Sequence, residues 1–306
     1  VFASPTIDVY PSAATVILTN KGNNDGYFAK YSAAGNFIWA VQIGGTSNDG
    51  VNGVAVDGSG NVYVTGYFNG TVDFDPSAAV YNLTAVGAGQ NITGDVFLAK
   101  YNSIGQLLWA FSYGSGTSFD YGWNVTVTPT GVVYVYGIMT MAGNIDIDPS
   151  AAVFNLNSAN GNAFIAKYNP NGQLVKGINL GASGQNSCVR EVKLDNSFMY
   201  VGGYIKGNCD IDPTAGVTNI TSTSEDPFII KLDTNFNFYW GFNVPTSQTD
   251  EGYSISFDAN NVFFSGYVTG SGIDFNPGSA NTNLSSHGQE DFFIASYTKN
   301  GTYRWA

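Results

Sequence analysis

Short apolar runs, each broken after five to seven residues by Gly, Asn, Asp or Pro, alternate with polar segments along the chain. Between residues 53 and 111 such runs occupy positions 53–57, 61–67, 95–101 and 107–111. Runs of this length that are rich in Val, Phe, Tyr and Thr predict β-strands, and two of the breaks are tight enough for hairpins. The pattern therefore predicts a four-stranded antiparallel sheet, whose strands we number first to fourth in chain order.

The same repeat recurs every 63 to 73 residues. Complete repeats are predicted at residues 53–114, 124–180, 189–243 and 253–306, and residues 1–44 supply only the third and fourth strands of another. The turn between these two strands carries a glycine, which a short hairpin needs for a left-handed conformation. Phe236 replaces this glycine in one repeat, where we expect a differently built turn, and Lys176 replaces a tryptophan that recurs in the fourth strand.

A single repeat has too little apolar surface to be stable alone, whereas sheets stacked face to face around an axis bury both faces of each sheet. The expected fold is all-β: one β-propeller domain over residues 1–306, built from four-stranded antiparallel blades. Residues 54–67, which read Val-Ala-Val-Asp-Gly-Ser-Gly-Asn-Val-Tyr-Val-Thr-Gly-Tyr, resemble the bacterial SBBP propeller repeat and, more distantly, the NHL repeat. With four complete repeats and an N-terminal half, we expect a five-bladed ring or a fragment of a larger propeller.

The charge balance limits the classes of partner. The net charge is −12, with 11 Lys plus Arg against 23 Asp plus Glu, so that neither nucleic acid nor an anionic membrane is an expected partner. No apolar run is long enough to span a bilayer. Low lysine and abundant Asn, Thr, Ser and Gly are typical of secreted proteins, so that we expect an extracellular or bacterial cell-surface location.

Paired aspartates recur in the long segment between the second and third strands, before a proline. An Asp-X-Asp pair places two carboxylates on one side of an extended segment, where they are able to bind Ca²⁺ as hard oxygen ligands. The alternative is that each aspartate caps a turn by accepting backbone N–H groups. The residues concerned are Asp73, Asp75, Asp146, Asp148, Asp210, Asp212, Asp274 and Asn276.

A second series of acidic residues precedes the first strand of each repeat. By analogy with the family, the loops that carry Asp49, Asp120, Asp250 and Glu251 lie on the same face as the long segments. We expect them to contribute to a ligand-binding face, or, in a glycosidase, to supply carboxylates around the axis. His287 is the only histidine and follows no nucleophile motif, so that the sequence favours a protein without enzymatic activity.

Cys188 and Cys209 are the only cysteines, and both lie in the repeat at 189–243 or directly before it. Because two unrelated positions change to cysteine in the same repeat, we expect a disulfide between them in an oxidising compartment. The lysines of the third strand, Lys30, Lys100, Lys167 and Lys231, are expected to make one structural contact per repeat, with a neighbouring carboxylate.

These observations predict a secreted or surface-displayed, non-enzymatic propeller that acts as a structural or adhesive module. Its partner is expected to be a protein or a carbohydrate at the cell surface, bound through the long segments. Two alternatives stay open. One is a propeller that binds or hydrolyses glycans through the axial carboxylates, and the other is a subunit of a larger extracellular assembly.

Overall fold

The computed structural model describes residues 1–87, 94–116, 119–140, 144–157, 162–182 and 185–306. Within these ranges the chain is all-β, and every strand pair assigned a register is antiparallel. The described residues include no helix long and apolar enough to cross a membrane. The sheets have up to four strands, as expected for propeller blades, while the number of blades and the closure of a ring stay predictions.

The chain divides into two compact units, and the boundary falls within one sheet. The first comprises Val1–Val135, Met139–Leu156 and Ala166–Val175, and the second Tyr136–Ile138, Asn157–Ile165 and Lys176–Ala306. We describe each compact unit by itself. The prediction of one domain over residues 1–306 stays a prediction.

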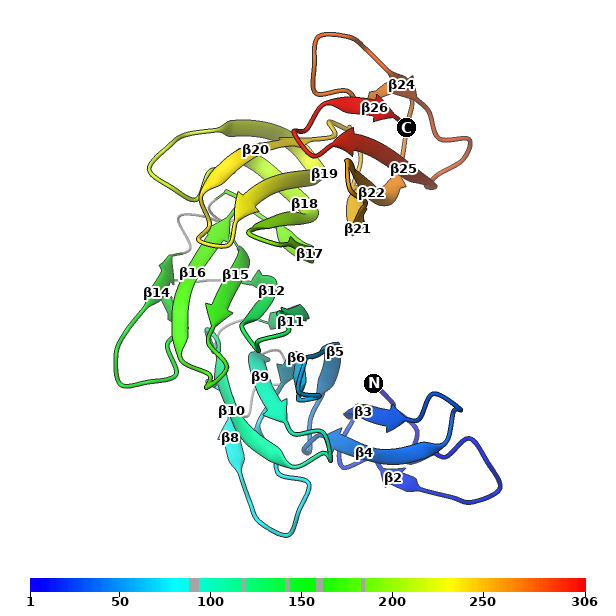
Figure 1. Cartoon of the computed structure of the whole chain (residues 1–306), viewed down its shortest axis with the longest axis vertical. Helices are drawn as coiled ribbons and strands as arrows, with labels where there is room; N and C mark the ends of the chain where they lie inside the picture. Colours follow the sequence, from blue (N-terminus) through cyan, green and yellow to red (C-terminus); the bar gives the residue numbers. More distant parts are fainter. Residues whose placement is uncertain (88–93, 117–118, 141–143, 158–161, 183–184) are drawn as a thin grey trace. The chain divides into compact units, whose positions relative to one another are not determined.

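In the first compact unit, a two-stranded sheet precedes a four-stranded one (Figure 1). The two-stranded sheet pairs β3 with β4, and the four-stranded sheet has the order β10-β9-β6-β5, which is the predicted hairpin arrangement. The strands are β3 (Gly26–Tyr31), β4 (Phe37–Ile43), β5 (Gly50–Val56), β6 (Val62–Phe68), β9 (Asp95–Tyr101) and β10 (Leu107–Tyr113).

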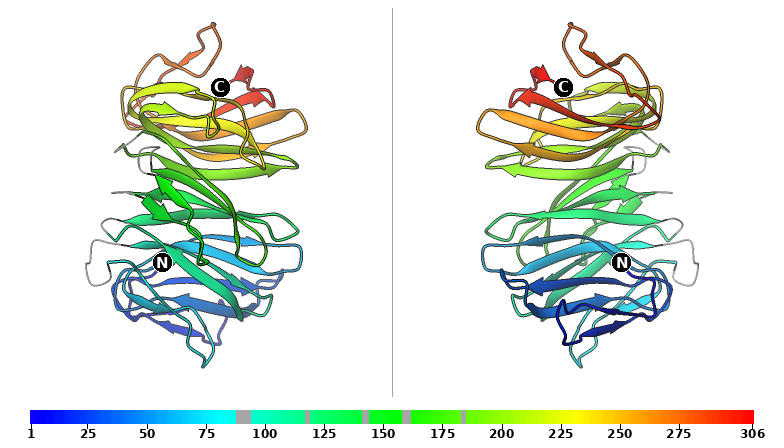
Figure 2. Two further views of the ribbon diagram at one scale, coloured as in Figure 1. Left: turned by 90° about the vertical axis from the view of Figure 1, so that its left-hand side faces the viewer. Right: turned by 90° about the vertical axis from the view of Figure 1, so that its right-hand side faces the viewer.

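The next sheet has the order β11-β12-β15-β16 and contains the boundary between the two compact units. The second compact unit then holds two further four-stranded sheets, β17-β18-β19-β20 and β21-β22-β25-β26. These two sheets lie face to face (Figure 2). The strands are β11 (Asp120–Val127), β12 (Val133–Met139), β15 (Ala163–Tyr168), β16 (Leu174–Leu180), β17 (Cys188–Asp195), β18 (Phe198–Asp210), β19 (Asn219–Asp233), β20 (Phe238–Asn243), β21 (Glu251–Phe257), β22 (Asn261–Val268), β25 (Asp291–Thr298) and β26 (Tyr303–Trp305).

The N-terminal segment contributes the antiparallel pair β3-β4, and Phe2 pairs with the residue just before it. Phe2 exchanges both backbone hydrogen bonds with Asp25 at the start of β3, with N···O distances of 2.9 and 3.1 Å. In the following repeat, at residues 53–114, Phe68 is the last residue of β6 and pairs with Asp95 of β9. Phe2 therefore occupies the place of the last residue of a second strand.

Hydrophobic side chains fill the space between successive sheets. In the first compact unit, Phe28 and Val41 pack with Val62, Val64 and the ring of Tyr101. In the second, Ile229 packs with residues of the following sheet, including Ile255, Phe264 and Phe293. Because both faces of a sheet contribute to such clusters, each sheet is stabilised chiefly by its neighbours.

A lysine and a tryptophan from one sheet hold the hairpin turn of the next. Lys30 Nζ and Trp39 Nε1 donate to the Ser103 carbonyl at 2.9 and 3.2 Å, and Lys231 Nζ and Trp240 Nε1 donate to the Lys299 carbonyl at 2.9 and 3.1 Å. Lys100 and Trp109 make the same pair of bonds to the Pro170 carbonyl. At Lys30, Lys100 and Lys231 the recurrent lysine thus contacts a main-chain carbonyl and not the predicted carboxylate.

The turn glycine completes this contact, because the tryptophan ring lies against it. A Cβ atom at Gly105 would lie 3.1 Å from the ring of Trp39, and one at Gly301 would lie 2.9 Å from Trp240. Both glycines have positive φ, 85° and 83°, and therefore also suit the left-handed conformation of the turn. Glycine is required here for two reasons, the backbone conformation and the approaching indole.

The exception at Phe236 is linked to the exception at Lys176, because the two residues contact each other and together replace the glycine and tryptophan of the other repeats. Phe236 adopts φ 63° and donates its N–H to the Asp233 carbonyl at 2.9 Å, as Gly105 does to Asn102. The prediction of a differently built turn was therefore wrong. Lys176 replaces the tryptophan: its Nζ donates to the Asn235 carbonyl at 2.8 Å and lies 5.8 Å from the centre of the Phe236 ring. In this exchange the turn supplies the aromatic ring, and the strand supplies a lysine in place of the tryptophan.

Candidate functional site

The long segment between the second and third strands of each repeat forms a two-stranded ribbon. In Figure 1 the loops of these ribbons project away from the sheets. In the repeat that contains β18 and β19, the ribbon is a continuation of these two long strands. The other ribbons are formed by β1 (Thr6–Asp8) with β2 (Ile17–Thr19), β7 (Thr71–Asp73) with β8 (Asn82–Thr84), β13 (Asn144–Asp146) with β14 (Asn155–Asn157), and β23 (Ile273–Asp274) with β24 (Asn283–Leu284).

The first aspartate of each Asp-X-Asp pair accepts two backbone hydrogen bonds from within its own ribbon loop. Asp73 Oδ1 accepts the N–H of Asp75 at 3.0 Å and that of Tyr81 at 2.8 Å. Its equivalents bond the residues two and eight positions further on in the same way, with N···O distances of 2.9 to 3.1 Å. These equivalents are Asp8, Asp146, Asp210 and Asp274.

The second residue of the pair caps the next turn. Asp75 Oδ1 accepts the Ser77 N–H at 2.8 Å, and this bond holds the pKa of Asp75 below its usual value. Asp148, Asp212 and Asn276 each accept from the residue two positions on, at 2.9 Å. The structure thus shows capped turns at all four Asp-X-Asp/Asn pairs named for calcium. No cluster of three or more His, Cys, Asp or Glu side chains suited to a metal occurs among the described residues, and calcium binding stays a prediction.

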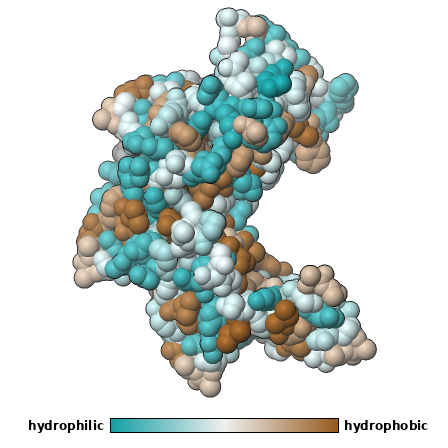
Figure 3. All heavy atoms as spheres, viewed as in Figure 1, coloured by the Kyte–Doolittle hydropathy of each residue, from teal (hydrophilic) through white to brown (hydrophobic). Residues whose placement is uncertain are grey.

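The capped loops expose a recurrent apolar side chain at their tips. Val80, Val153 and Val217 occupy equivalent positions, and their exposed fractions are 69%, 69% and 71%. Figure 3 shows hydrophobic colouring on the projecting loops. Exposed apolar side chains on a fixed backbone are able to contact a partner with little loss of backbone entropy.

The aspartates expected on a ligand-binding face are instead buried. Asp49, Asp120 and Asp250 are completely shielded from solvent. Asp49 accepts the Gly45 N–H at 2.7 Å and the Asn69 N–H at 2.9 Å, and so ties the loop before β5 to the end of β6. Asp120 bonds Ser115 and Thr140 in the same manner, at 2.7 and 2.8 Å. Asp49 and Asp120 therefore hold loops together, and none of the three carboxylates is exposed to solvent.

The aspartate at the start of the third strand lies close to this series. Asp25, Asp95 and Asp226 are buried as well. Burial raises the pKa of Asp49 and Asp95 to about 6 and that of Asp120 to about 7, and the nearby charges of Asp25 and Asp95 add to the increase at Asp49 and Asp120 respectively. In the repeat that begins at β17 the place of Asp49 is taken by Ser187, whose Oγ accepts the Lys206 N–H at 3.2 Å.

Glu251 belongs to a cluster that the sequence patterns did not reveal. Its Oε2 lies 2.5 Å from Nη2 of Arg190, and the Arg190 guanidinium lies 5.2 and 5.4 Å from the ring centres of Tyr204 and Tyr253. The side chains of both ion-pair partners are largely buried, with exposed fractions of 9% and 12%. Arginine at a position filled elsewhere by Asn52, Trp123 or Tyr253 was the available signal.

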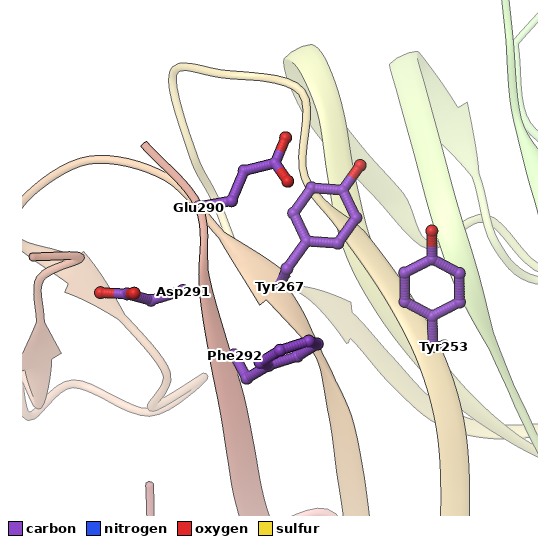
Figure 4. A pocket seen from close by; sticks show the side chains of 5 residues that line it. All are labelled: Tyr253, Tyr267, Glu290, Asp291 and Phe292. Atoms are coloured by element: carbon purple, nitrogen blue, oxygen red, sulfur yellow. The ribbon is translucent and has the colours of Figure 1, made fainter. Parts of the chain in front are cut away.

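A pocket of about 310 Å³ lies beside this cluster, on the last sheet (Figure 4). Tyr253, Tyr267, Glu290, Asp291 and Phe292 line it. Tyr267 pairs directly with Phe292 across β22 and β25. Figure 4 shows the rings of Tyr253, Tyr267 and Phe292 on one side of the sheet with Glu290, while Asp291 points away, as alternation along a strand requires.

Both cysteines are free thiols in the structure, contrary to the predicted disulfide. The strand register gives the reason: Cys188 on β17 lies opposite Tyr204, whereas Cys209 lies opposite Ile220 on β19. Burial raises the pKa of both thiols to about 12, so that both stay protonated and unreactive near neutral pH.

His287 does not take part in a catalytic arrangement within the described residues. Its side chain is exposed, and its Nδ1 lies 3.8 Å from Asp291 Oδ2. Its backbone N–H also donates to Asp291, at 2.5 Å, which marks a loop contact. No serine hydroxyl is bonded to its ring among the described contacts, so that the geometry offers no nucleophile and base pair.

Comparison with known proteins supports the repeat assignment. Residues 38–72, which span β4 to the middle of β7, match the SBBP family, described as a β-propeller repeat. The resemblance noted in the sequence is confirmed over this range.

Two curated proteins are similar to parts of the chain. An uncharacterised WD repeat-containing protein of Acanthamoeba polyphaga mimivirus is 28% identical over 165 residues, which cover 51% of this chain and 11% of that protein. The regulatory protein FlaEY of Caulobacter vibrioides is 24% identical over 212 residues, covering 67% of this chain and 21% of the relative. The chain thus spans a small part of both relatives. Residues 38–72 carry an SBBP β-propeller repeat, and the all-β sheets around them are consistent with a propeller of the kind that serves as a binding module.

Proposed function

We propose that this chain is a secreted or cell-surface, non-enzymatic binding module that uses the tips of its ribbons to hold a protein partner in a structural or adhesive role. The observation that carries the proposal is the recurrence of one capped loop, with an exposed valine, in three repeats. A loop that serves only as a connection has no need of this precise construction or of an apolar tip.

The acidic composition supports a partner with a basic or neutral surface, since the net charge of −12 repels polyanions. Each ribbon is rigidified by its own side-chain caps, which reduces the entropy lost on binding. Several equivalent tips also allow weak contacts to act together, as in other multivalent binders.

The test replaces the three tip valines at once: Val80→Ser, Val153→Ser and Val217→Ser. Arrays of purified extracellular proteins identify a partner for the wild-type chain, and surface plasmon resonance then measures its affinity for both forms. We expect at least a tenfold loss of affinity, since burying one valine contributes about 1.5 kcal/mol.

The matched control carries Val54→Ser, Val56→Ser and Val175→Ser, which change valines on the sheets that are 54 to 58% exposed. This control should bind like the wild type. Equal binding by the ribbon variant and the wild type, or an equal loss in both triple variants, would contradict a role for the ribbon tips.

The extracellular location is tested separately, in intact source cells. If the chain is displayed at the surface, an antibody against it labels unpermeabilised cells, and protease added outside removes the signal. Labelling that requires permeabilisation would contradict surface display, and the same chain in the culture medium would indicate secretion.

Calcium is proposed only as an addition to the capped loops. A ligand that binds the folded state alone must raise the unfolding temperature, so that a chelator should lower it if Ca²⁺ binds at the Asp-X-Asp pairs. An unchanged temperature in wild-type protein treated with chelator and then with added Ca²⁺ would reject the hypothesis.

The glycan alternative relied on Asp49, Asp120, Asp250 and Glu251. Asp49, Asp120 and Asp250 are fully buried, and Glu251 is paired with Arg190. A glycan array read for both binding and cleavage products tests this alternative. Cleavage that survives substitution of Asp250 and Glu251 would exclude these residues as its catalysts.

A further inference from the structure

Three pairs of aspartates are buried where one sheet follows another along the chain. In each pair, one aspartate lies at the start of a third strand, and the other lies at the start of the next sheet's first strand. None of the six takes part in an ion pair between described residues. The pairs are Asp25 with Asp49 and Asp95 with Asp120 in the first compact unit, and Asp226 with Asp250 in the second, and all six residues are at most 1% exposed.

The two carboxylates of a pair approach the same N–H group, in the loop between a fourth strand and the next first strand. This N–H donates to the second aspartate in the first two pairs and to the first aspartate in the third pair. The donors are Gly45 N at 2.7 Å, Ser115 N at 2.7 Å and Thr246 N at 3.1 Å. In all three pairs the N–H of the second aspartate also donates to the carbonyl of the residue before the first, at 2.8 Å. Two carboxylates are therefore held close together, away from water.

Each pair also has a buried carboxylate oxygen that no hydrogen bond satisfies. These atoms are Oδ1 of Asp25, Oδ1 of Asp95 and both carboxylate oxygens of Asp250, and none has a hydrogen-bond partner among the described residues. The carboxylates of Asp25 and Asp95 lie directly beside the shared N–H group, because a Cβ atom added at Gly44 or Gly114 would overlap them. Buried charges in proteins are normally paired or bound to a metal, and an unsatisfied buried oxygen indicates a bound water or ion.

We propose that each of the three aspartate pairs binds one divalent metal cation. The unsatisfied carboxylate oxygens bind the cation directly, and water molecules complete its coordination. Carboxylates and water are the ligands that suit Ca²⁺ and Mg²⁺, and a charge of +2 balances the two carboxylates. Hydroxyl oxygens lie nearby as well, from Ser115 beside Asp120 and from Thr246 and Thr269 beside Asp250. These sites are separate from the Asp-X-Asp pairs of the ribbons and do not depend on the proposed function.

A fourth pair of equivalent positions lacks both charges. Asn162 and Ser187 occupy the places of the two aspartates there. Oδ1 of Asn162 is likewise buried without a partner among the described residues, so that a water molecule fits beside it. Without a carboxylate we expect no cation at this position. The sheets around it are formed like the others, which shows that the fold accepts a neutral pair.

Protons compete with a cation for the same oxygens. Burial raises the pKa of Asp49 and Asp95 to about 6 and that of Asp120 to about 7. Asp25 and Lys21 are charged groups that act on Asp49, and Asp95 acts on Asp120. In metal-free protein, protons alone neutralise the pairs at low pH. Cation binding should therefore weaken as pH falls through these values, and the affinity should be at least about tenfold lower at pH 5 than at pH 8.

Isothermal titration calorimetry of the metal-free full chain with Ca²⁺, and separately with Mg²⁺, counts the sites at pH 8. The paired variant Asp95→Asn with Asp120→Ser copies the neutral pair and should bind one cation fewer than the wild type. The same exchange at the first pair, Asp25→Asn with Asp49→Ser, should also remove one cation. The second variant keeps the test decisive if the first does not fold.

The control is Asp233→Asn with Asp258→Asn, which removes two carboxylates that cap hairpin turns. It should bind as many cations as the wild type. Cations held by the Asp-X-Asp pairs would persist in all variants and so do not affect the difference. A wild-type chain that binds neither cation at pH 8 would overturn the proposal. An unchanged number of cations in both paired variants, or equal affinity at pH 5 and pH 8, would overturn it as well.

Discussion

We call the contact between one sheet and the next sheet along the chain a junction, and name it by the last strand of the first sheet. The junction that follows β16 differs from the junctions that follow β4, β10 and β20. At those three, a tryptophan ring lies on a turn glycine, whereas at the β16 junction Lys176 meets Phe236. The hydrogen bond from the strand to a turn carbonyl persists in all four. Each of the four junctions thus has one hydrogen-bond donor to the turn and one aromatic ring between the two sheets. The strand supplies this ring at three junctions, and the turn supplies it at the fourth.

The junction after β16 also differs in the charge of its buried polar side chains. The two positions that hold buried aspartates elsewhere, such as Asp95 and Asp120, are Asn162 and Ser187 there. A neutral amide and a hydroxyl thus occupy the places of two carboxylates. The loop contacts therefore do not require a buried charge. The buried aspartates make the stability of the other junctions depend on pH, whereas the junction after β16 lacks these two carboxylates.

The largest effect we expect is that of pH on the whole chain. A carboxyl whose folded pKa is raised binds its proton more tightly in the folded state, so that folding is favoured at low pH and this advantage is lost as pH rises from about 4 to the folded value. Burial raises the pKa of Asp49 and Asp95 to about 6 and of Asp120 to about 7. Thermal unfolding should occur roughly 10 °C higher at about pH 5 than at about pH 8.

Asp95→Asn, which copies Asn162, checks the origin of this effect. The amide oxygen is able to accept the Val86 N–H that Asp95 Oδ2 accepts at 2.7 Å. The variant should unfold at a higher temperature than the wild type near pH 8 and show a smaller difference between the two pH values. A pH dependence that is unchanged in the variant would assign it to other groups.

The next effect is that of placing a second ring at a tryptophan junction. Gly301→Phe forces a Cβ atom to within 2.9 Å of Trp240 and should destabilise the fold by about 3 kcal/mol, measured by chemical denaturation. Gly35→Phe is the control: its φ of 80° is close to the 83° of Gly301, but no atom lies within 4 Å. Equal losses in both variants would show that backbone strain alone is responsible.

A double-mutant cycle at Lys176 and Phe236 tests whether the exchange is coupled. Phe236→Gly leaves a gap that Lys176 does not fill, and Lys176→Trp crowds Phe236. The combined variant restores the arrangement of the other junctions, and its destabilisation should be about 2 kcal/mol less than the sum of the single changes. Additive effects would mean that the two exceptions arose independently.

The smallest effect concerns the recurrent lysine donor. Lys231→Met keeps an aliphatic side chain and removes the ammonium group, whose Nζ lies 4.4 Å from the centre of the Phe198 ring and donates to the Lys299 carbonyl. Trp240 still contacts this carbonyl in the variant. We expect a loss of about 1 kcal/mol in the free energy of unfolding. Lys193→Met, at a lysine whose side chain is 44% exposed, is the control and should change the free energy of unfolding by less than half as much.

The sequence allowed the sheets and their order to be predicted, because each strand is a local apolar run bounded by turn residues. It also allowed the capping alternative at Asp73 and its equivalents to be stated, since those bonds span at most eight residues. The burial of Asp49 and Asp120 was not predictable in this way. An aspartate in a loop serves equally as an exposed ligand or as a buried cap, and only the fold of the loops around it decides.

The exceptions at Lys176 and Phe236 were both visible in the sequence, but their connection was not. They are separated by about one repeat, and only the packing of one sheet on the next brings them together. The disulfide prediction was wrong for a related reason. Cys188 and Cys209 share a repeat, yet a shared repeat does not place two residues opposite each other in a sheet.

The ribbon loops have a practical use that follows from how they are held. Every cap described at Asp73 and its equivalents joins residues of one short segment. The conformation of the loop is therefore stabilised by hydrogen bonds within the loop itself. A foreign peptide inserted between such anchor points would be presented at the surface while the sheets beneath stay intact. The chain is thus a natural scaffold for displaying several grafted epitopes at once.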